Sequence, residues 1–432
     1  MELSTVLSLV LVLLGYLWWK VTRPKSFPPG PLALPIVGNL LQVDFNNFLK
    51  DLKEFSKAYG PVYSIYLGTT PAVVVRGYKA IKEVLITKGT EFADRPLNGI
   101  LQAVSGNRGL VIAPYGQAWK EHRRFTLSTL RSFGLGKKSM EERIAEESSY
   151  LIKEFEKNKD TLLNPHVAID NAVSNIICSI VFGRRYDYDD STFQNVLNLV
   201  HENMKLTTSV WTQEREQDSS RTTYDSKNLF ACVVDLFVGG TDTTSASLEW
   251  CLLYMMRFPD IQEKCRNEID KVRGDRERLD YEDRVCMPYT QAVLQEVQRF
   301  TNVVPLGAPH STLKDEQLNG FTIPKGTMII IDLSSLHKDE TYWKYPDEFN
   351  PENFLNEDGE LLKVESFLPF SAGPRGCIGE NLARMELFLF FTTLLTHFEF
   401  QWPDPASPPD LTPVFGITQP TKPFKMRLVS RR

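Results

Sequence analysis

The segment FSAGPRGCIGENLARME, from Phe370 to Glu386, decides the fold, because it sets one cysteine among three glycines at the start of a helical pattern. The glycines permit backbone angles that other residues avoid, and they let a flat ligand approach the chain closely. From Ile378 onward, apolar residues recur with a helical period, so we expect Cys377 at a helix N-terminus. The helix dipole and the free N–H groups at that end favour a thiolate over a thiol.

Two other side chains of this segment suit a bound cofactor. Arg375 adds a positive charge to the loop, which favours both a thiolate and an anionic cofactor edge. Phe370 is expected to cover the sulfur and keep it dry. A buried cysteine in a glycine-rich turn is the alternative interpretation, and the spacing of the loop residues decides between the two.

This spacing resembles the FxxGxRxCxG haem-ligand signature of the cytochrome P-450 family. The five matching positions are Phe370, Gly373, Arg375, Cys377 and Gly379. The resemblance implies that the cofactor is haem b, iron protoporphyrin IX, and that Cys377 supplies its axial thiolate. It also implies that Phe370, Arg375 and Gly379 belong to the cofactor-binding loop.

Length and composition limit the class of protein. The chain has 432 residues, of which 42% are hydrophobic, so it forms either several domains or one large layered domain. A net charge of -5 lacks the basic excess of a nucleic-acid-binding protein, and we expect no nucleic acid as a partner. The six cysteines form no CxxC pair, which argues against a disulfide framework or a zinc site and favours a reducing compartment.

The first twenty residues predict a membrane anchor. Leu3 to Trp19 is an uncharged run of 17 residues that ends in aromatic residues and is followed by basic ones. A bilayer-spanning helix needs ~20 residues, and basic residues on the C-terminal side keep that side in the cytosol. A cleaved signal peptide is the alternative, but no basic segment precedes the apolar run and no small-residue cleavage site precedes Lys20. We therefore expect a retained anchor over residues 1–20.

Behind the anchor, we expect a hinge and then one large domain. Five prolines within a dozen positions predict a semi-rigid linker over residues 21–38 that spaces the globular part from the membrane. Residues 39–432 then show helical periods with a few alternating strands, so the expected fold is mainly α with small β-sheets (α+β). The predicted helices are Asn47–Tyr59, Trp119–Leu130, Glu141–Asn158, His166–Phe182, Ser191–Leu206, Asn228–Arg257, Asp260–Arg273 and Tyr289–Phe300, and the strands are Val62–Leu67, Ala72–Arg76, Ile323 and Met328–Asp332. The tail after Trp402 is expected to be irregular.

The helix Asn228–Arg257 carries a second motif. We expect it to be broken and bent at GGTDTTS, where two glycines remove side chains and hydroxyl groups bond back to carbonyls. A structural kink is the alternative to a functional role. GGTDTT resembles the oxygen-binding motif of the cytochromes P-450, which implies that Asp242 and Thr243 relay protons to oxygen in a dry pocket.

With both motifs, nearly the whole chain resembles the microsomal cytochromes P-450, and the vertebrate family 2 in particular. The resemblance implies that haem propionates bind to five side chains: Arg95, Trp119, Arg123, His310 and Arg375. For Trp119 and Arg123, ordinary helix packing is the alternative, since both lie on one helical face. Glu296 and Arg299 resemble the family's structural ExxR pair, whereas a surface ion pair is the alternative. Asn353 stands where the family has an arginine in the same network.

The resemblance also implies partners, substrate and location. Electrons come from NADPH through cytochrome P-450 reductase, with cytochrome b5 as a further partner, and the domain lies on the cytosolic face of the endoplasmic reticulum. A basic cluster suits an acidic redox partner, although a solvated charged face is the alternative; it comprises Lys120, Arg124, Arg131, Lys137 and Lys138. Apolar contacts to a lipophilic fatty acid, steroid or xenobiotic are expected from Ile100–Ile112, Phe237–Thr243, Val303–Leu306 and Phe415–Thr418.

One segment departs from the family. Thr212–Lys227 is almost wholly polar, and the chain is about sixty residues short there by comparison with the family's overall length. We interpret the chain as a splice-type or incomplete product that lacks the roof of the substrate pocket. An active monooxygenase is the first functional hypothesis, and a haem-binding but catalytically impaired protein that engages membrane or partners is the alternative. Isomerase or peroxygenase chemistry is disfavoured because Asp242 and Thr243 are intact.

Overall fold

The computed structural model describes residues 21–45, 47–96, 106–134, 138–159, 161–207, 225–404, 406–414 and 416–431, with a few single positions before residue 21. Most of the expected anchor (1–20) and most of the polar segment (212–227) lie outside these residues. Within the described part of the chain, no helix is both long and apolar enough to span a bilayer. The chain divides into two compact units: a sheet unit (1–99, 305–339 and 371–376) and a helical unit (100–304, 340–370 and 377–432).

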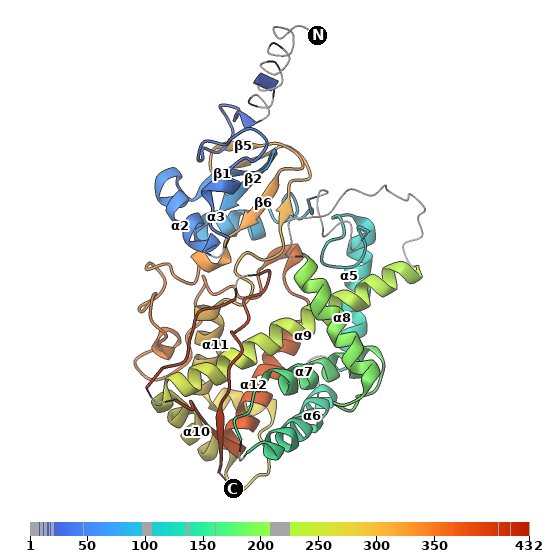
Figure 1. Ribbon diagram of the computed structural model, residues 1–432, viewed down its shortest axis with the longest axis vertical. Coiled ribbons are helices and arrows are strands. Elements are labelled where there is room, and N and C mark those ends of the chain that lie inside the picture. The colour runs from blue at the N-terminus through green and yellow to red at the C-terminus, as the bar shows by residue number, and fades with distance from the viewer. Residues whose placement is uncertain are drawn as a thin grey trace. The chain divides into compact units, whose positions relative to one another are not determined.

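The sheet unit is built on a four-stranded sheet with the order β1-β2-β6-β3 (Figure 1). The first two strands form an antiparallel hairpin, β6 runs parallel to β2, and β3 runs antiparallel to β6. The three valines of β2, Val73, Val74 and Val75, are fully buried, as suits a strand inside the sheet. The strands are β1 (Val62–Leu67), β2 (Thr70–Val75), β3 (His310–Ser311), β4 (Glu316–Leu318), β5 (Phe321–Ile323) and β6 (Met328–Ile331), and the helical segments are η1 (Leu40–Gln42), α2 (Phe48–Tyr59), α3 (Tyr78–Lys82), η2 (Glu83–Thr87), η4 (Leu333–Ser335) and η6 (Gly373–Arg375).

The proline-rich segment is part of the sheet unit, so the prediction of a separate linker over 21–38 is wrong. The Ser64 N–H donates to the Pro29 carbonyl at 2.7 Å, and Arg23 donates to the Ser64 hydroxyl at 2.7 Å. A side chain at Gly30 would approach the Ser64 carbonyl oxygen to 1.9 Å. Hydrogen bonds to β1 therefore hold a segment whose composition alone indicates an extended spacer.

The helical unit is arranged around one long helix, α9 (Ser226–Arg257), which packs against α7, α8, α10, α11 and α12 (Figure 1). The helix is continuous through its glycines, so the predicted break is wrong. The tail after Trp402 also differs from the prediction, because β8 pairs with β7 in an antiparallel ribbon. The other elements are α5 (Gln117–Ser132), α6 (Lys138–Lys157), α7 (His166–Val181), α8 (Ser191–Thr207), α10 (Pro259–Arg273), η3 (Tyr281–Cys286), α11 (Pro288–Thr301), η5 (Pro351–Phe354), α12 (Glu380–His397), β7 (Phe398–Gln401) and β8 (Arg427–Ser430).

A histidine links the start of α7 to α9. His166 Nδ1 lies 2.5 Å from Glu249 Oε1, and Nε2 lies 3.4 Å from Asp170 Oδ2. The other oxygen of Glu249 accepts a hydrogen bond from the Thr421 hydroxyl at 2.6 Å. The hydrogen bond to Glu249 raises the pKa of His166 to about 9, with help from the charge of Asp170.

This linkage predicts an alkaline loss of stability. An unfolded histidine titrates near ~6.5, so His166 stabilises the fold fully below that pH, and the contribution disappears as the pH rises through about 9. The difference in melting temperature between wild type and His166→Gln should therefore shrink between pH 7 and pH 10. Glu249→Gln should remove the same pH dependence. A gap that stays constant with pH would contradict the assignment.

Candidate functional site

Cys377 lies immediately before α12, whose N-cap is Gly379, as the sequence predicts. The Cys377 N–H donates to the Phe370 carbonyl at 3.0 Å, which closes the loop. The sulfur accepts hydrogen bonds from the backbone N–H groups of Gly379 and Glu380 at the helix end. The loop therefore directs two backbone donors at the sulfur, the arrangement that stabilises a metal-bound thiolate.

The protonation of Cys377 differs from the expectation. Although the residue has exposed surface, burial of the thiol among protein atoms raises its pKa, and this effect exceeds the lowering by the N–H donors and by Arg123. The prediction that the loop alone favours a thiolate is therefore wrong. The cation that acts on the sulfur is Arg123 of α5. A bound metal ion deprotonates a coordinating thiol outright, so the thiolate depends on the metal.

Two predicted cofactor arginines lie in the sheet unit and are buried. The Arg375 Nε atom donates to the Ala93 carbonyl at 2.8 Å, and Arg95 donates to the Pro309 carbonyl at 2.7 Å. Both guanidinium charges act on His310 and lower its pKa. The sheet unit thus gathers two cations, which suit the carboxylates of haem.

The protonation of the His310 ring differs from that expected of a residue that donates a hydrogen bond to a propionate. Burial, with the charge of Arg95, lowers the pKa of His310 to about 3, so the ring is neutral. Its Nδ1 atom lies 2.8 Å from the Phe92 carbonyl oxygen, which only accepts, so Nδ1 carries the proton. The Nε2 atom is then an acceptor, and a propionate would bind there only with uptake of a proton. The role of His310 stays a prediction.

The loop glycines serve different purposes. Gly373 has φ +71°, and a side chain there would meet the Leu85 carbonyl oxygen at 1.8 Å, so only glycine fits. A side chain at Gly379 would lie 3.9 Å from the Cys377 sulfur, an ordinary contact. Gly379 therefore acts through its N–H and not through the lack of a side chain.

Trp119 and Arg123 lie together on α5, as their spacing predicts. The Arg123 guanidinium lies 5.4 Å from the centre of the Trp119 ring. The indole N–H, however, donates to the Leu110 carbonyl at 2.9 Å within the protein. A propionate would have to replace this carbonyl, so the role of Trp119 as a propionate donor also stays a prediction.

Asp242 and Thr243 occupy the middle of α9. The Thr243 hydroxyl donates to the Gly239 carbonyl one turn earlier at 2.7 Å, the back-bonding that the motif predicts. Asp242 Oδ2 accepts a hydrogen bond from the Thr418 hydroxyl at 2.6 Å. A hydroxyl and a carboxylate thus lie at one place on the helix, each held by one hydrogen bond.

Exposure along α9 changes abruptly at this motif. From residue 226 to 243 only Phe237 and Thr241 are buried, whereas every residue from Thr244 to Met256 is buried. Gly239 is exposed, and a side chain there would meet nothing within 4 Å. The half of the helix that carries Asp242 is therefore accessible to water.

The Glu296–Arg299 pair is fully buried, so a surface ion pair is excluded. Arg299 binds both carboxylate oxygens at 2.6 and 2.7 Å and donates to the carbonyls of Pro346 and Glu348 at 2.9 and 2.8 Å. The Asn353 amide donates to Glu296 at 3.2 Å. Asparagine therefore completes the network at the position where the family pattern has arginine.

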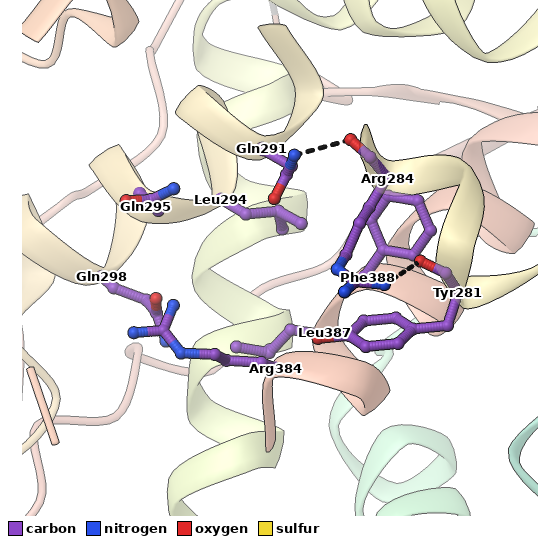
Figure 2. Close-up of a pocket in the computed structure, with 9 residues that line it drawn as sticks. All are labelled: Tyr281, Arg284, Gln291, Leu294, Gln295, Gln298, Arg384, Leu387 and Phe388. Carbon is purple, nitrogen blue, oxygen red and sulfur yellow. Dashed lines mark hydrogen bonds between the residues drawn. The ribbon is translucent and has the colours of Figure 1, made fainter. Parts of the chain in front are cut away.

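A pocket of about 300 Å³ lies elsewhere in the helical unit, between η3, α11 and α12 (Figure 2). It is lined by nine residues, among them Arg284, Gln291, Arg384 and Phe388, and by none of the predicted site residues. A hydrogen bond from Gln291 to the Arg284 carbonyl at 2.6 Å closes one side. This pocket therefore does not mark the site.

One buried acid near the motif was missed by sequence reasoning. Glu386 of α12 is 1% exposed, and its Oε1 atom has no hydrogen-bond partner among the described residues. Its signal in the sequence is an acidic residue inside an otherwise apolar helix.

Comparison with known proteins identifies the family. The Cytochrome P450 family model matches residues 28–214 and 206–428. Cytochrome P450 2J5 of Mus musculus is 41% identical over 456 residues, covering 92% of this chain and 91% of the relative. Cytochrome P450 2J2 of Homo sapiens is 40% identical over 458 residues, covering 93% and 91%, and cytochrome P450 2D6 of Homo sapiens is 38% identical over 489 residues, covering 99% and 98%.

The chain belongs to the cytochrome P450 family, and the similar proteins are members of its family 2. This is a family of monooxygenases that carry haem with a cysteine thiolate as axial ligand, take electrons from a redox partner and bind small-molecule substrates. In the helical unit, Cys377 before α12 fits the thiolate ligand of that cofactor. The family model matches in two segments that meet at residues 206–214, and the 489 positions aligned with 2D6 exceed the 432 residues of the whole chain. The internal shortening is therefore near the predicted place.

Proposed function

We propose that this chain is a monooxygenase of the endoplasmic reticulum membrane that inserts one oxygen atom from O2 into a lipophilic fatty acid, steroid or xenobiotic. Electrons come from NADPH through cytochrome P-450 reductase, with cytochrome b5 as a further donor. The observation that carries the proposal is the position of Cys377. It precedes α12 in the family's loop, and its sulfur accepts hydrogen bonds from the N–H groups of Gly379 and Glu380. These donors suit a thiolate that is bound to a metal ion.

The proposed roles follow from the chemistry of each side chain. Cys377 is the axial ligand, and the haem, when bound, supplies the binding and reduction of O2. The loop donors from Gly379 and Glu380 hold the sulfur in one orientation and share its negative charge. In the helical unit Arg123 balances that charge, and in the sheet unit Arg95 and Arg375 are proposed to pair with propionates.

Asp242 and Thr243 are proposed to deliver protons. Thr243 holds a hydroxyl proton that now points to the Gly239 carbonyl, so a rotation of its side chain would free the proton for delivery. Once the hydrogen bond from Thr418 to Asp242 is broken, Asp242 donates a proton to the Thr243 oxygen and so restores its hydroxyl group. Water reaches this half of α9. It returns a proton to Asp242, but it also supplies protons that do not pass through the relay.

Removal of the relay hydroxyl should uncouple the reaction. We expect Thr243→Val to lower product formed per NADPH by about 10²-fold, the usual contribution of a positioned proton donor, with hydrogen peroxide in its place. Product and peroxide should be measured together. Thr396→Val is the matched control, because Thr396 makes the same back-bond at the end of α12. Unchanged coupling in Thr243→Val would remove Thr243 from the relay.

Positive charge on α5 and at the start of α6 supports the proposed redox partner. Lys120, Arg124, Arg131 and Lys138 are all exposed, while Lys137 lies outside the described residues. An acidic partner surface would bind these cations at a rate that falls with salt.

The test of the proposed function has two steps. Protein expressed with haem is reduced and treated with carbon monoxide, and the thiolate-type Soret band is expected. Reductase, NADPH and a lipophilic probe are then added, and NADPH-dependent oxidation of the probe is expected. Lack of the thiolate band would overturn the haem-thiolate assignment, and a thiolate band without product would overturn the monooxygenase proposal.

A further inference from the structure

The pocket between η3, α11 and α12 has no role in the proposed function (Figure 2). Its volume is about 300 Å³, and all of its lining residues belong to the helical unit. Small-molecule sites have volumes of ~300–1,000 Å³, so a pocket of this size suits a small ligand. Which ligand it suits depends on the chemistry of the lining side chains.

Part of the lining is apolar and buried. Leu294, Leu387 and Phe388 are buried, whereas the polar lining residues are half-buried. The Tyr281 ring meets Phe388 edge to face, with 5.9 Å between the ring centres, which closes the pocket on that side. The apolar part of a ligand would therefore be removed from water against these side chains.

The two charged residues among the described lining are both arginines, so no carboxylate lines the pocket. Arg284 lies beside Tyr281, with its guanidinium 4.0 Å from the centre of the ring. The Arg384 guanidinium points toward Gln298, and Figure 2 shows the apolar side chain of Leu387 between the two positive groups. The pocket thus has a cation at each end and an apolar middle.

Hydrogen bonds among the lining residues use few of the available donors. Arg284 donates to the Tyr281 carbonyl at 2.7 Å, and Gln291 donates to the Arg284 carbonyl at 2.6 Å. The side-chain amides of Gln295 and Gln298 make no hydrogen bond to another lining residue (Figure 2). A guanidinium carries five N–H groups and no acceptor, so the lining offers mainly donors. Carboxylates and phosphates are the groups that such donors bind most strongly.

Both arginines have counter-ions outside the pocket, but these are accessible to water. Arg384 pairs with Glu380 at 3.0 Å, and the two side chains are 34% and 42% exposed. Arg284 lies 3.6 Å from Glu282, whose side chain is 85% exposed. Exposed ion pairs contribute little to stability, so an anionic ligand can replace these partners at small cost.

One end of the pocket borders the cysteine loop. The Arg384 guanidinium lies 4.9 Å from the centre of the Phe370 ring, and the Phe370 carbonyl accepts a hydrogen bond from the Cys377 N–H at 3.0 Å. Glu380, the ion-pair partner of Arg384, is the first residue of α12. A ligand that binds Arg384 therefore acts on the segment that holds Cys377.

We propose that this pocket binds a small dianion with an apolar middle, the chemistry of an α,ω-dicarboxylate. One carboxylate binds Arg284, the other binds Arg384 in place of Glu380, and the methylene chain packs on Leu294 and Leu387. Two separate cations favour two separate anionic groups over a single one. The site lies apart from the proposed site of oxidation, so it goes beyond the proposed function and does not depend on it.

The proposal is tested with matched ligands on the full, haem-loaded chain. Succinate, adipate, suberate and sebacate are titrated by calorimetry, and each is compared with its own monomethyl ester. We expect one chain length to bind best. Its monoester should bind about tenfold more weakly, because one charge-assisted contact is lost at a half-buried site. Added salt should weaken binding of the diacid more than binding of the ester.

Variants then assign the binding to this pocket. Arg284→Gln and Arg384→Gln should each lower the affinity for the diacid about tenfold, to that of the monoester. Glu380→Gln should raise the affinity, because it removes the carboxylate that competes for Arg384. Arg266→Gln is the matched control and should leave binding unchanged, since Arg266 pairs with Glu399 at 2.6 Å and does not line the pocket.

Three results would overturn the proposal: no heat of binding with any diacid, equal affinities for diacid and monoester, or binding that persists in the Arg284→Gln, Arg384→Gln double variant. The last result would place the ligand elsewhere, for example at the haem. Haem content and melting temperature verify that each variant is folded. Failure of the proposed function is distinguishable, because it is measured by the thiolate band and by product and leaves the calorimetry unchanged.

Discussion

Replacing Cys377 with serine is expected to remove the thiolate-type carbon monoxide spectrum and to abolish NADPH-dependent oxidation. A serine hydroxyl does not ionise in this loop, where burial already raises the pKa of the cysteine thiol. Without a thiolate, electron density at the iron is too low to favour O–O cleavage. The measurement is the reduced, carbon monoxide-bound spectrum together with product formation, at equal protein concentration.

Cys286→Ser is the matched control for this experiment. Cys286 lies in η3, is exposed and belongs to no predicted site, so its replacement should leave spectrum and turnover unchanged. Cys377→His adds a second arm: it should retain haem through an imidazole ligand while the thiolate band is lost. A thiolate band that survives in Cys377→Ser would show that another cysteine ligates the iron.

Replacing Glu296 with alanine is expected to destabilise the protein by about 3–5 kcal/mol, the cost of leaving one partner of a buried ion pair without the other. Both side chains are fully buried, and Arg299 also holds the carbonyls of Pro346 and Glu348. Without Glu296 the guanidinium is left as a buried, uncompensated charge. Chemical denaturation and the haem content of purified protein measure the effect.

A surface pair with the same spacing is the control. Glu54 and Lys57 of α2 lie 2.8 Å apart, also three residues apart, but both are exposed. Glu54→Ala should leave the free energy of unfolding almost unchanged, because solvent screens an exposed pair. Asn353→Ala should fall between the two, at about 1–3 kcal/mol, because it removes one buried hydrogen-bond donor. An effect of Glu296→Ala as small as that of Glu54→Ala would show that the network does not hold the segment that contains Pro346 and Glu348.

Much of the fold was predictable because the signals are local. The β1–β2 hairpin and the helices α2, α7, α10 and α11 follow from the period of their apolar residues over a few turns, and their bounds differ from the predictions by at most two residues. Likewise, the place of Cys377 at a helix N-terminus follows from glycine spacing and the first turns of α12. The family could also be predicted from the sequence, because the residues of the FxxGxRxCxG pattern and those of the GGTDTT pattern are each contiguous in the chain.

Predictions failed where a distant partner replaces a local preference. Prolines predict a free linker over 21–38, but Ser64 of β1 binds it. The glycines of α9 predict a break, but the helices packed on α9 keep it continuous. Strand β8 could not be predicted from the proline-rich tail in which it lies, because only its pairing with β7 makes it a strand.

For Cys377, the sequence by itself determined the ligand and the two backbone donors, because these depend on a few consecutive residues. Only the tertiary structure decided the balance of effects on its pKa, since desolvation of the thiol outweighs the backbone donors at the helix end and raises the pKa. It also decided that Asn353 completes the buried pair. This contact joins residues 57 positions apart in the chain, and no local pattern records which side chains such packing brings together.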